Sequence, residues 1–329
     1  MKTICYYHDD ADGILSAALV NHFVDGEKVF VKSSYGMNID FDIIGVCDTI
    51  YIVDFSFEPH LMDTLCVMSE KVIWIDHHAS AIKAWDDYVS SMRVKYPKFP
   101  DMDGIREIGK SGCQLTEQYF YNSPNRNVTN HRINKPWKEG HNCSELVETI
   151  GTYDVWNKNN EDIPFDRAHK CMLGFIGRGL TPESEFLKEC FSVEHPWSMV
   201  NELVDEGEII KQYLDKFQNK KISKNAFETR VFGHSTIAVN TPLKGAAPLL
   251  EKFYEKNFDM MCVYFFNGKM WEYSFYTEKE DVNCAVVARS MAKDDTGIGG
   301  GHKKAAGCVL KRNLFDNTMK TASDIAIYD

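Results

Sequence analysis

MKTICYYHDDADGILSAALV, residues 1–20, joins a short apolar run directly to a cluster of one histidine and three aspartates. Residues 3–7 (TICYY) predict a buried strand, and residues 14–22 predict the helix that follows it. The cluster between them consists of His8, Asp9, Asp10 and Asp12. Carboxylates this close repel one another at neutral pH, so the sequence predicts a positively charged partner beside them.

The same pattern, an apolar strand followed at once by an acid, occurs twice more. TIYIV (49–53) precedes Asp54, and KVIWI (71–75) precedes the triplet DHH (76–78). Strands that alternate with helix-like stretches predict an α/β fold with a doubly wound, mostly parallel sheet. Because parallel strands end at one edge of a sheet, we expect these acids to converge there.

Length and apolar spacing predict two domains joined by a helix. The 329 residues exceed one ordinary core, and apolar residues recur at helical spacing within 199–217. We expect a catalytic domain over 1–190, a linker helix over 191–224 and a smaller α/β substrate-binding domain over 225–329, with the active site in the cleft between the domains. A polar stretch at 122–138 is predicted to be a surface loop of unassigned role.

Composition excludes several classes of protein. The formal net charge of −11 argues against a long basic surface for duplex DNA but leaves a short anionic ligand open. Ten cysteines without a C-x-x-C pair indicate neither a thiolate zinc site nor a disulfide framework. There is no signal-peptide pattern and no run of about 18 apolar residues, so we expect a cytoplasmic protein without membrane contact.

A fourth acid, Asp154, follows a predicted helix over 144–150, and we place it at the same edge as the others. The candidate set is then His8, Asp10, Asp12, Asp54, His77 and Asp154. Two divalent cations would compensate these carboxylates, and imidazole with carboxylate favours Mn²⁺ or Fe²⁺ over Mg²⁺ and Zn²⁺. Paired metal ions about 3.5–4 Å apart are typical of sites for displacement at phosphorus.

The acidic residues admit other interpretations. A single aspartate at a strand end is most often a cap or turn residue. An EF-hand alignment fails, because Leu19 falls at the position that requires glutamate. In a phosphatase of the haloacid-dehalogenase type, Asp10 would be the nucleophile and Asp12 the acid, but that leaves residues 76–78 without a role.

The glycine-rich stretch GIGGGHKKAAG (297–307) is the second candidate for chemistry. Successive glycines allow backbone N–H groups to line an anion site, to which the neighbouring basic residues add charge. The dinucleotide fingerprint G-x-G-x-x-G does not fit, because His302 stands where its third glycine belongs. Taken alone, such a glycine run is more often a simple loop.

Together HDDADG, VDF, IDHH and GTYD resemble the DHH phosphoesterase superfamily, and GGGH resembles its DHH-associated C-terminal domain. The resemblance spans nearly the whole chain. It implies that His8, Asp10 and Asp54 hold one metal ion, and that Asp12, Asp54, His77 and Asp154 hold the other, with Asp54 bridging. It further implies that Asp76 orients a histidine and that His78 faces the substrate as the catalytic residue.

One departure concerns the grip on the substrate. Many relatives carry an arginine where this chain has Tyr276, so a cation that could bind phosphate bidentately is missing there. Tyr276 could instead stack on a base. The candidate substrate-binding residues are Gly299, Gly300, Gly301, His302, Lys303 and Tyr276.

The function expected from the resemblance is that of a Mn²⁺-dependent phosphodiesterase. It would hydrolyse very short oligonucleotides (nano-RNA or dinucleotides) to mononucleotides with a metal-activated water. Alternatives within the superfamily are a 3′-phosphoadenosine 5′-phosphate phosphatase, a cyclic dinucleotide phosphodiesterase and a single-strand exonuclease. A nucleotide-binding sensor is the non-enzymatic alternative, and a homodimer is left open. An inorganic pyrophosphatase shares the first motifs but not GGGH.

Overall fold

The computed structural model describes residues 2–34, 37, 39–44, 47–122, 144–192, 197–242 and 258–315, except for the side chains of 217–224. The chain divides into two compact units, Met1–Gln212 and Tyr213–Asp329. The division falls within helix α9 (Trp197–Asn225), and the domain limits expected from the sequence stay predictions. No helix in the described parts of the chain is long and apolar enough to cross a membrane.

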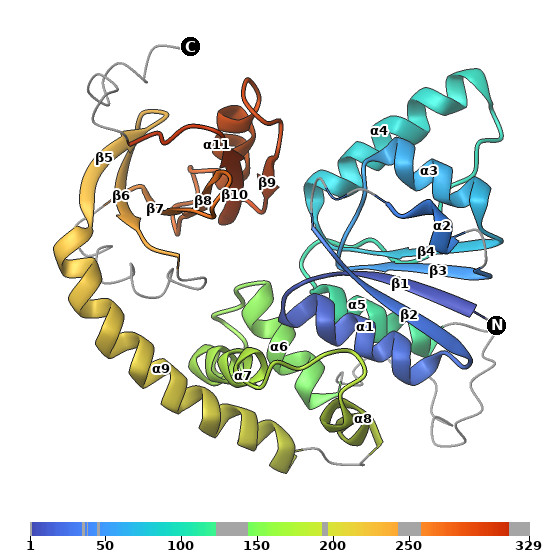
Figure 1. Cartoon of the computed structure of the whole chain (residues 1–329), viewed down its shortest axis with the longest axis horizontal. Helices are drawn as coiled ribbons and strands as arrows, with labels where there is room; N and C mark the ends of the chain where they lie inside the picture. The colour runs from blue at the N-terminus through green and yellow to red at the C-terminus, as the bar shows by residue number, and fades with distance from the viewer. Residues whose placement is uncertain are drawn as a thin grey trace. The chain divides into compact units, whose positions relative to one another are not determined.

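The first unit is built on a four-stranded parallel sheet (Figure 1). Its strands are β1 (Lys2–His8), β2 (Glu27–Ser33), β3 (Thr49–Val53) and β4 (Lys71–Ile75), in the order β2-β1-β3-β4. All five residues of β3 are buried, as expected of a parallel strand covered on both faces. The predicted α/β class and the predicted strands at 3–7, 49–53 and 71–75 are confirmed.

Helices cover both faces of this sheet, so it is doubly wound as predicted. Within β1, Cys5 and Tyr7 face one core while Ile4 and Tyr6 face the other. The helices on the Cys5 side are α1 (Ala11–Phe23), α5 (Gly112–Asn122), α6 (Glu145–Asp154), α7 (Phe165–Gly177), α8 (Glu185–Ser192) and the first part of α9. Those on the Ile4 side are α2 (Phe41–Ile44), α3 (Pro59–Met68) and α4 (Ala79–Lys95).

Helix α9 is fixed to α7 at its start by glycines and ion pairs. A Cβ on Gly174 would collide with the carbonyl oxygen of Leu203, and one on Gly207 with that of Lys170, so the two helices approach backbone to backbone. Arg178 at the end of α7 pairs with Glu206 at 2.6 Å. The first part of α9 therefore belongs structurally to the first unit, and the predicted helix over 199–217 is confirmed within longer bounds.

The second unit contains a mixed six-stranded sheet in the order β5-β6-β7-β8-β10-β9. Its elements are β5 (Phe227–Val231), β6 (His234–Asn240), β7 (Met260–Phe266), β8 (Trp271–Tyr276), α11 (Cys284–Ala292), β9 (Gly299–Gly301) and β10 (Ala305–Leu310). A hairpin at Asn267-Gly268 joins β7 to β8, with Gly268 at φ 95°. Of the polar stretch predicted to be a surface loop, residues 123–138 lie outside the described residues.

The glycine-rich stretch is a strand in part. Gly299–Gly301 forms β9, which pairs antiparallel with β10 at the edge of the sheet. Its lack of side chains has a packing reason, because a Cβ on Gly299 would lie 2.5 Å from the carbonyl oxygen of Ala288 in α11. Gly301 has φ 130°, a conformation that L side chains rarely adopt. The stretch is therefore a strand over Gly299–Gly301, and its role in substrate binding stays a prediction.

Asp259 ties together three segments of the second unit. Its carboxylate accepts a hydrogen bond from the Ser235 amide at 2.8 Å and pairs with Lys279 Nζ at 2.7 Å. Its carbonyl oxygen accepts from the Thr277 hydroxyl at 2.7 Å. The hydrogen bond from Lys279 and those from Ser235 lower the pKa of Asp259 to about 2.

We predict that Asp259→Asn lowers the free energy of unfolding of the second unit by about 1–2 kcal/mol at pH 7, with allowance for solvent screening of a partly exposed pair. Because the folded-state pKa lies below the unfolded value, this stabilisation is complete above about pH 4 and disappears as the pH falls towards 2. Urea unfolding of the full chain between pH 7 and pH 3 measures it. Asp87→Asn, at an exposed i,i+4 pair with Lys83, is the matched control and should change stability by less than about 0.5 kcal/mol.

Candidate metal centre

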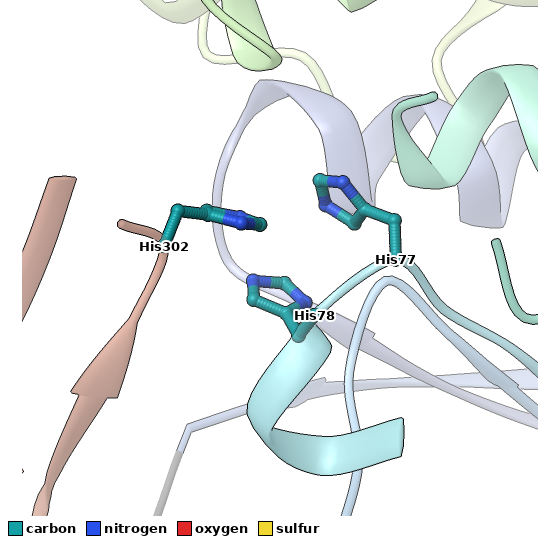
Figure 2. A group of neighbouring side chains, drawn as sticks. All are labelled: His77, His78 and His302. Carbon is teal, nitrogen blue, oxygen red and sulfur yellow. The ribbon is translucent and has the colours of Figure 1, made fainter. Parts of the chain in front are cut away.

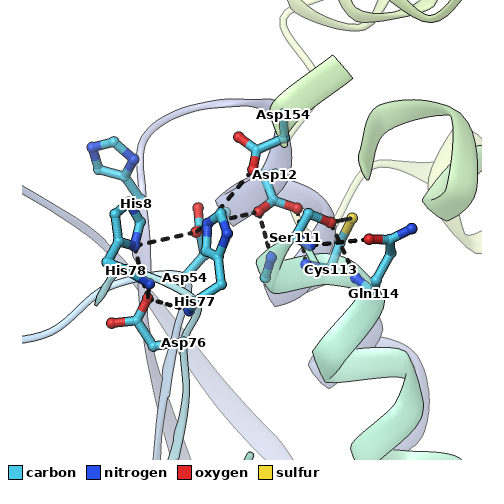
Figure 3. Close-up of polar contacts among 12 residues, drawn as sticks. His8, Asp12, Asp54, Asp76, His77, His78, Ser111, Cys113, Gln114 and Asp154 are labelled. Atoms are coloured by element: carbon cyan, nitrogen blue, oxygen red, sulfur yellow. Dashed lines mark hydrogen bonds and ion pairs between the residues drawn. The ribbon is translucent and has the colours of Figure 1, made fainter. Parts of the chain in front are cut away.

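The sheet order brings the acidic segments together at one edge. The chain leaves β1 towards β2 on one side and returns to β3 on the other, so the ends of β1 and β3 flank the point where the strand order reverses. Ligand sites of open α/β sheets lie at this point, beyond the carboxyl ends of the strands. Asp10 lies two residues beyond the end of β1. His8 ends β1, Asp54 follows β3 and His77 lies two residues beyond β4 (Figure 3).

His8, Asp10 and Asp54 form the first group, with potential ligand atoms all within 4.8 Å of one another. Asp10 is also the N-cap of α1, because its Oδ1 accepts the Gly13 amide at 2.9 Å while Oδ2 lies 2.6 Å from His8 Nδ1. Desolvation alone would raise the pKa of Asp10, but the charge and hydrogen bond of His8 hold it well below its usual range. Asp10 is thus a helix cap and a candidate ligand at once.

Asp54 lies at the centre of the arrangement and is only 2% exposed. Its φ of 51° is left-handed, and its amide donates to the Ile75 carbonyl at 2.9 Å, so the backbone leaves β3 in a fixed direction. Its Oδ1 lies 3.1 Å from His77 Nε2. Burial, followed by repulsion from Asp12 and Asp10, raises the pKa of Asp54 well above its ordinary value.

Asp12, His77 and Asp154 form the second group. Three carboxylates converge on His77 Nε2, with Asp54 at 3.1 Å, Asp154 at 3.5 Å and Asp12 at 3.8 Å. Burial and the neighbouring His78 lower the pKa of His77, whereas burial and the charges of Asp12 and Asp10 raise that of Asp154. His77 therefore joins the second group to Asp54 of the first.

Asp154 reaches this position from the end of a helix. The predicted helix over 144–150 extends further, and Asp154 is the last residue of α6. Thus the expectation that Asp154 follows the helix is corrected by one helical turn. Its side chain is 27% exposed, but Oδ2 is buried and accepts no hydrogen bond from the residues that the structure describes.

The amino terminus of α5 holds Asp12, a contact that the sequence interpretation missed. The amides of Gly112 and Cys113 donate to the two carboxylate oxygens of Asp12 at 2.6 and 2.8 Å. Ser111 and Gln114 form a reciprocal capping box at this helix start, with the Ser111 amide donating to Gln114 Oε1 at 3.0 Å. The S-x-x-Q pattern predicts the helix start, but nothing local predicts its distant partner.

His78 is oriented by Asp76. Asp76 is fully buried, and its Oδ1 lies 2.7 Å from His78 Nδ1 while also accepting the His77 amide at 2.8 Å. Burial would lower the pKa of His78, but the charge and hydrogen bond of Asp76 raise it above its usual value. Figure 2 shows the two histidine rings projecting from the segment that joins β4 to α4. The histidine that Asp76 was predicted to orient is therefore His78.

The candidate residues of the second unit occupy definite places within it. His302 directly follows β9, and its amide donates to the Ala305 carbonyl at 2.7 Å (Figure 2). Lys303 pairs with Glu280 at 3.2 Å. Tyr276 ends β8, and its ring packs against the core cluster that contains Ile237 and Val239. Burial raises the pKa of the Tyr276 hydroxyl.

The donor set of the first unit fits divalent metal ions. Two adjacent groups of imidazole and carboxylate are linked through Asp54 and His77. Burial, followed by mutual repulsion, raises the pKa values of Asp54 and Asp154, and a cation would stabilise such carboxylates. The buried Asp154 Oδ2 without a donor is a further ligand position. Residues His8, Asp10, Asp12, Asp54, His77 and Asp154 lie together as predicted, whereas their binding of metal stays a prediction.

No protein-family model matches the chain, and no curated protein matches it in sequence. Among solved structures, it is similar to a DHH domain described as a member of the s1p family of ribosomal proteins. The TM-score is 0.59 at 12% identity, over 94% of this chain and 82% of that chain. The chain has the DHH fold. The DHH resemblance inferred from the motifs is thus confirmed at the level of the fold.

Two further structures are similar at lower TM-scores. RecJ from Thermus thermophilus in complex with Mn²⁺ has a TM-score of 0.49 at 15% identity, over 94% of this chain and 49% of that chain. A pGpG-specific phosphodiesterase from Vibrio cholerae has a TM-score of 0.43 at 12% identity, over 94% of each chain.

We predict that Gly112→Ala weakens divalent metal binding to the first unit by about 10- to 100-fold, as expected when a residue that supports a ligand is displaced. The added Cβ would lie 2.5 Å from Asp54 Cβ and 3.0 Å from Asp12 Oδ2, so both carboxylates must move. Calorimetric titration of metal-stripped protein with Mn²⁺ measures the affinity. Gly177→Ala is the control, because its Cβ meets the flexible end of Ile210; equal affinity of the Gly112 variant would contradict the role given to α5.

We also predict that Asp54→Asn stabilises the metal-free protein, raising Tm by about 2–8 °C, while it abolishes the further rise that Mn²⁺ gives to wild type. The substitution removes the charge that burial and neighbouring acids disfavour, and asparagine tolerates the left-handed backbone at this position. Thermal unfolding with and without Mn²⁺ measures both effects. A metal-free Tm below that of wild type would show that the Asp54 charge does not destabilise the metal-free protein.

Proposed function

We propose that this chain is a divalent-metal-dependent phosphodiesterase that hydrolyses very short oligonucleotides to mononucleotides. The observation that carries the proposal is the pair of adjacent imidazole and carboxylate groups, linked through Asp54, at the switch point of the sheet. Oxygen and nitrogen donors without thiolate favour Mn²⁺ among the common ions. The chemistry that two such ions supply when bound is activation of water and screening of the phosphoryl oxygens.

The residues of the first unit divide the work. His8, Asp10 and Asp54 would hold one ion, and Asp12, Asp54, His77 and Asp154 would hold the other. Asp54 would be a ligand of both ions, so a substitution of Asp54 would weaken both metal sites. Asp12 is kept in place by the α5 amides, and Asp10 by the start of α1.

His78 is the proposed catalytic residue. Asp76 fixes the tautomer and the plane of its ring through the 2.7 Å contact at Nδ1, which directs the opposite nitrogen, Nε2, away from Asp76. From this position His78 would hydrogen bond to the oxygen that leaves phosphorus and assist its departure. The role of Asp76 is positioning, since it acts through His78.

The second unit would hold the rest of the substrate through Gly299–Gly301, His302, Lys303 and Tyr276. We propose that such a substrate is a very short oligonucleotide. The net charge of −11 supports a short substrate over a long strand.

The decisive experiment incubates metal-stripped protein with linear 5′-phosphorylated diadenylate, with and without Mn²⁺, and separates the products by chromatography. We expect Mn²⁺-dependent release of adenosine monophosphate by wild type and a loss of at least about 10³-fold in Asp54→Asn, because Asp54 belongs to the first group, lies 3.1 Å from His77 of the second and would be common to both metal ions. Asp9→Asn is the matched control: Asp9 neighbours Asp10 but pairs with Lys32 at 3.0 Å, so activity should be unchanged.

Each contrary result has a separate meaning. Wild-type activity in the Asp54 variant would rule out catalysis at this centre. Absence of turnover by wild type with Mn²⁺ bound would rule out the diadenylate substrate and favour phosphoadenosine phosphate, a cyclic dinucleotide or a sensing role.

A further inference from the structure

The loop that follows Asp154 has an unusual residue at its tightest point. Helix α6 ends in a Schellman motif, in which the Trp156 amide donates to the Tyr153 carbonyl at 3.1 Å and the Asn157 amide to the Thr152 carbonyl at 2.9 Å. Trp156 occupies the left-handed position of this motif, with φ 57°. Glycine is the residue usually found there, because a side chain makes this backbone conformation costly.

The Trp156 side chain belongs to an aromatic cluster formed with Tyr153, Phe165 and His169. The ring of Tyr153 stacks on Phe165 and on His169, with centroids 5.5 and 5.1 Å apart. Trp156 packs edge to face on Phe165 at 4.7 Å. Three of the four residues, Tyr153, Trp156 and Phe165, are partly exposed, so the cluster reaches the protein surface.

This loop is held rigidly by hydrogen bonds. Asn160 donates to the Thr152 hydroxyl at 2.7 Å, and its side-chain oxygen accepts the amides of Asp162 and Ile163 at 3.0 Å each. Glu148 in α6 accepts from Gln114 at the start of α5, at 2.7 Å. The aromatic cluster is therefore preorganised on the same scaffold that holds the metal centre.

Trp156 lies close in sequence to the candidate metal centre. It lies two residues beyond Asp154, whose carboxylate is 3.5 Å from His77, so the Cα atoms of Trp156 and Asp154 are at most about 7.6 Å apart. Lys158 Nζ lies 5.2 Å from the Trp156 ring centroid and adds a positive charge beside a strongly acidic site.

We propose that Trp156 and its aromatic neighbours form a stacking platform for a nucleobase of the substrate, next to the phosphate held at the metal centre. The proposal rests on the proposed function, since it assigns the base of the nucleotide whose phosphate reacts. It gives a reason for a tryptophan at a position where glycine would relieve the backbone. Flat aromatic rings bind any base by stacking, so the platform selects a nucleotide over a bare sugar phosphate without reading the sequence of bases.

The test is calorimetric titration of the Mn²⁺-loaded full chain with adenosine monophosphate and, separately, with ribose 5-phosphate. We expect wild type to bind the nucleotide about 5- to 150-fold more tightly, the range that base–aromatic stacking contributes. Trp156→Gly, which keeps the Schellman motif, should remove most of this ratio and leave the ribose 5-phosphate affinity unchanged. Trp156→Phe should retain most of it.

Two further variants keep the test decisive. Trp156→Asn also suits a left-handed backbone and replaces the glycine variant should that one unfold, and Trp197→Ala removes an exposed tryptophan outside the cluster as the control. A wild-type ratio near one, or an unchanged ratio in Trp156→Gly or Trp156→Asn, overturns the platform. Failure of the proposed function is distinguishable, since it would appear as no cleavage of diadenylate by a wild type that still discriminates adenosine monophosphate from ribose 5-phosphate.

Discussion

The main constraint on the first unit is that three parallel strands place mutually repelling carboxylates at one edge of the sheet. This convergence follows from the strand register, because β1, β3 and β4 end side by side and each leads into an acidic segment. The surrounding elements hold these groups against their repulsion. Asp10 is fastened to the start of α1 and Asp12 to the start of α5, while Asp54 is fixed by a left-handed backbone. The fold thus holds these carboxylates together in spite of a repulsion that a bound cation would relieve.

The sequence predicted the parts of this arrangement that have a local signature. A short apolar strand with an acid at its end is visible in five or six residues, and the parallel alternation of strands and helices then requires convergence. The contact of Asp12 with Gly112 and Cys113 has no such signature, because it joins residues 100 and 101 positions apart. Likewise, the extension of α6 to Asp154 depends on its packing, since a valine and a tryptophan follow without the glycine that usually marks a helix end.

The glycine-rich stretch illustrates a second limit. Its glycines suggested a loop that approaches an anion, and the structure gives two of them a packing reason of their own, the contact of Gly299 with α11 and the left-handed backbone of Gly301. Lys303, one of the cations expected to add charge, is paired with Glu280. Packing and ligand binding select the same residue type here, so glycine alone does not distinguish them. By contrast, tryptophan at the left-handed position of α6 has no backbone reason, and this contrast makes it informative.

The long reach of the Asp12 contact also sets an order of assembly during synthesis. His8, Asp10 and Asp54 can come together once β1 and β3 have paired and the Ile75 carbonyl has fixed the Asp54 backbone, which needs the chain as far as β4. The second group also needs α5, which supports Asp12, and Asp154, which lies 79 residues beyond Ile75 (154 − 75). Contacts between distant segments form late because closing a long loop is entropically costly. A cation bound early by a nascent chain would therefore lie at the group of His8, Asp10 and Asp54. The group of Asp12, His77 and Asp154 would form last, when the first unit has folded.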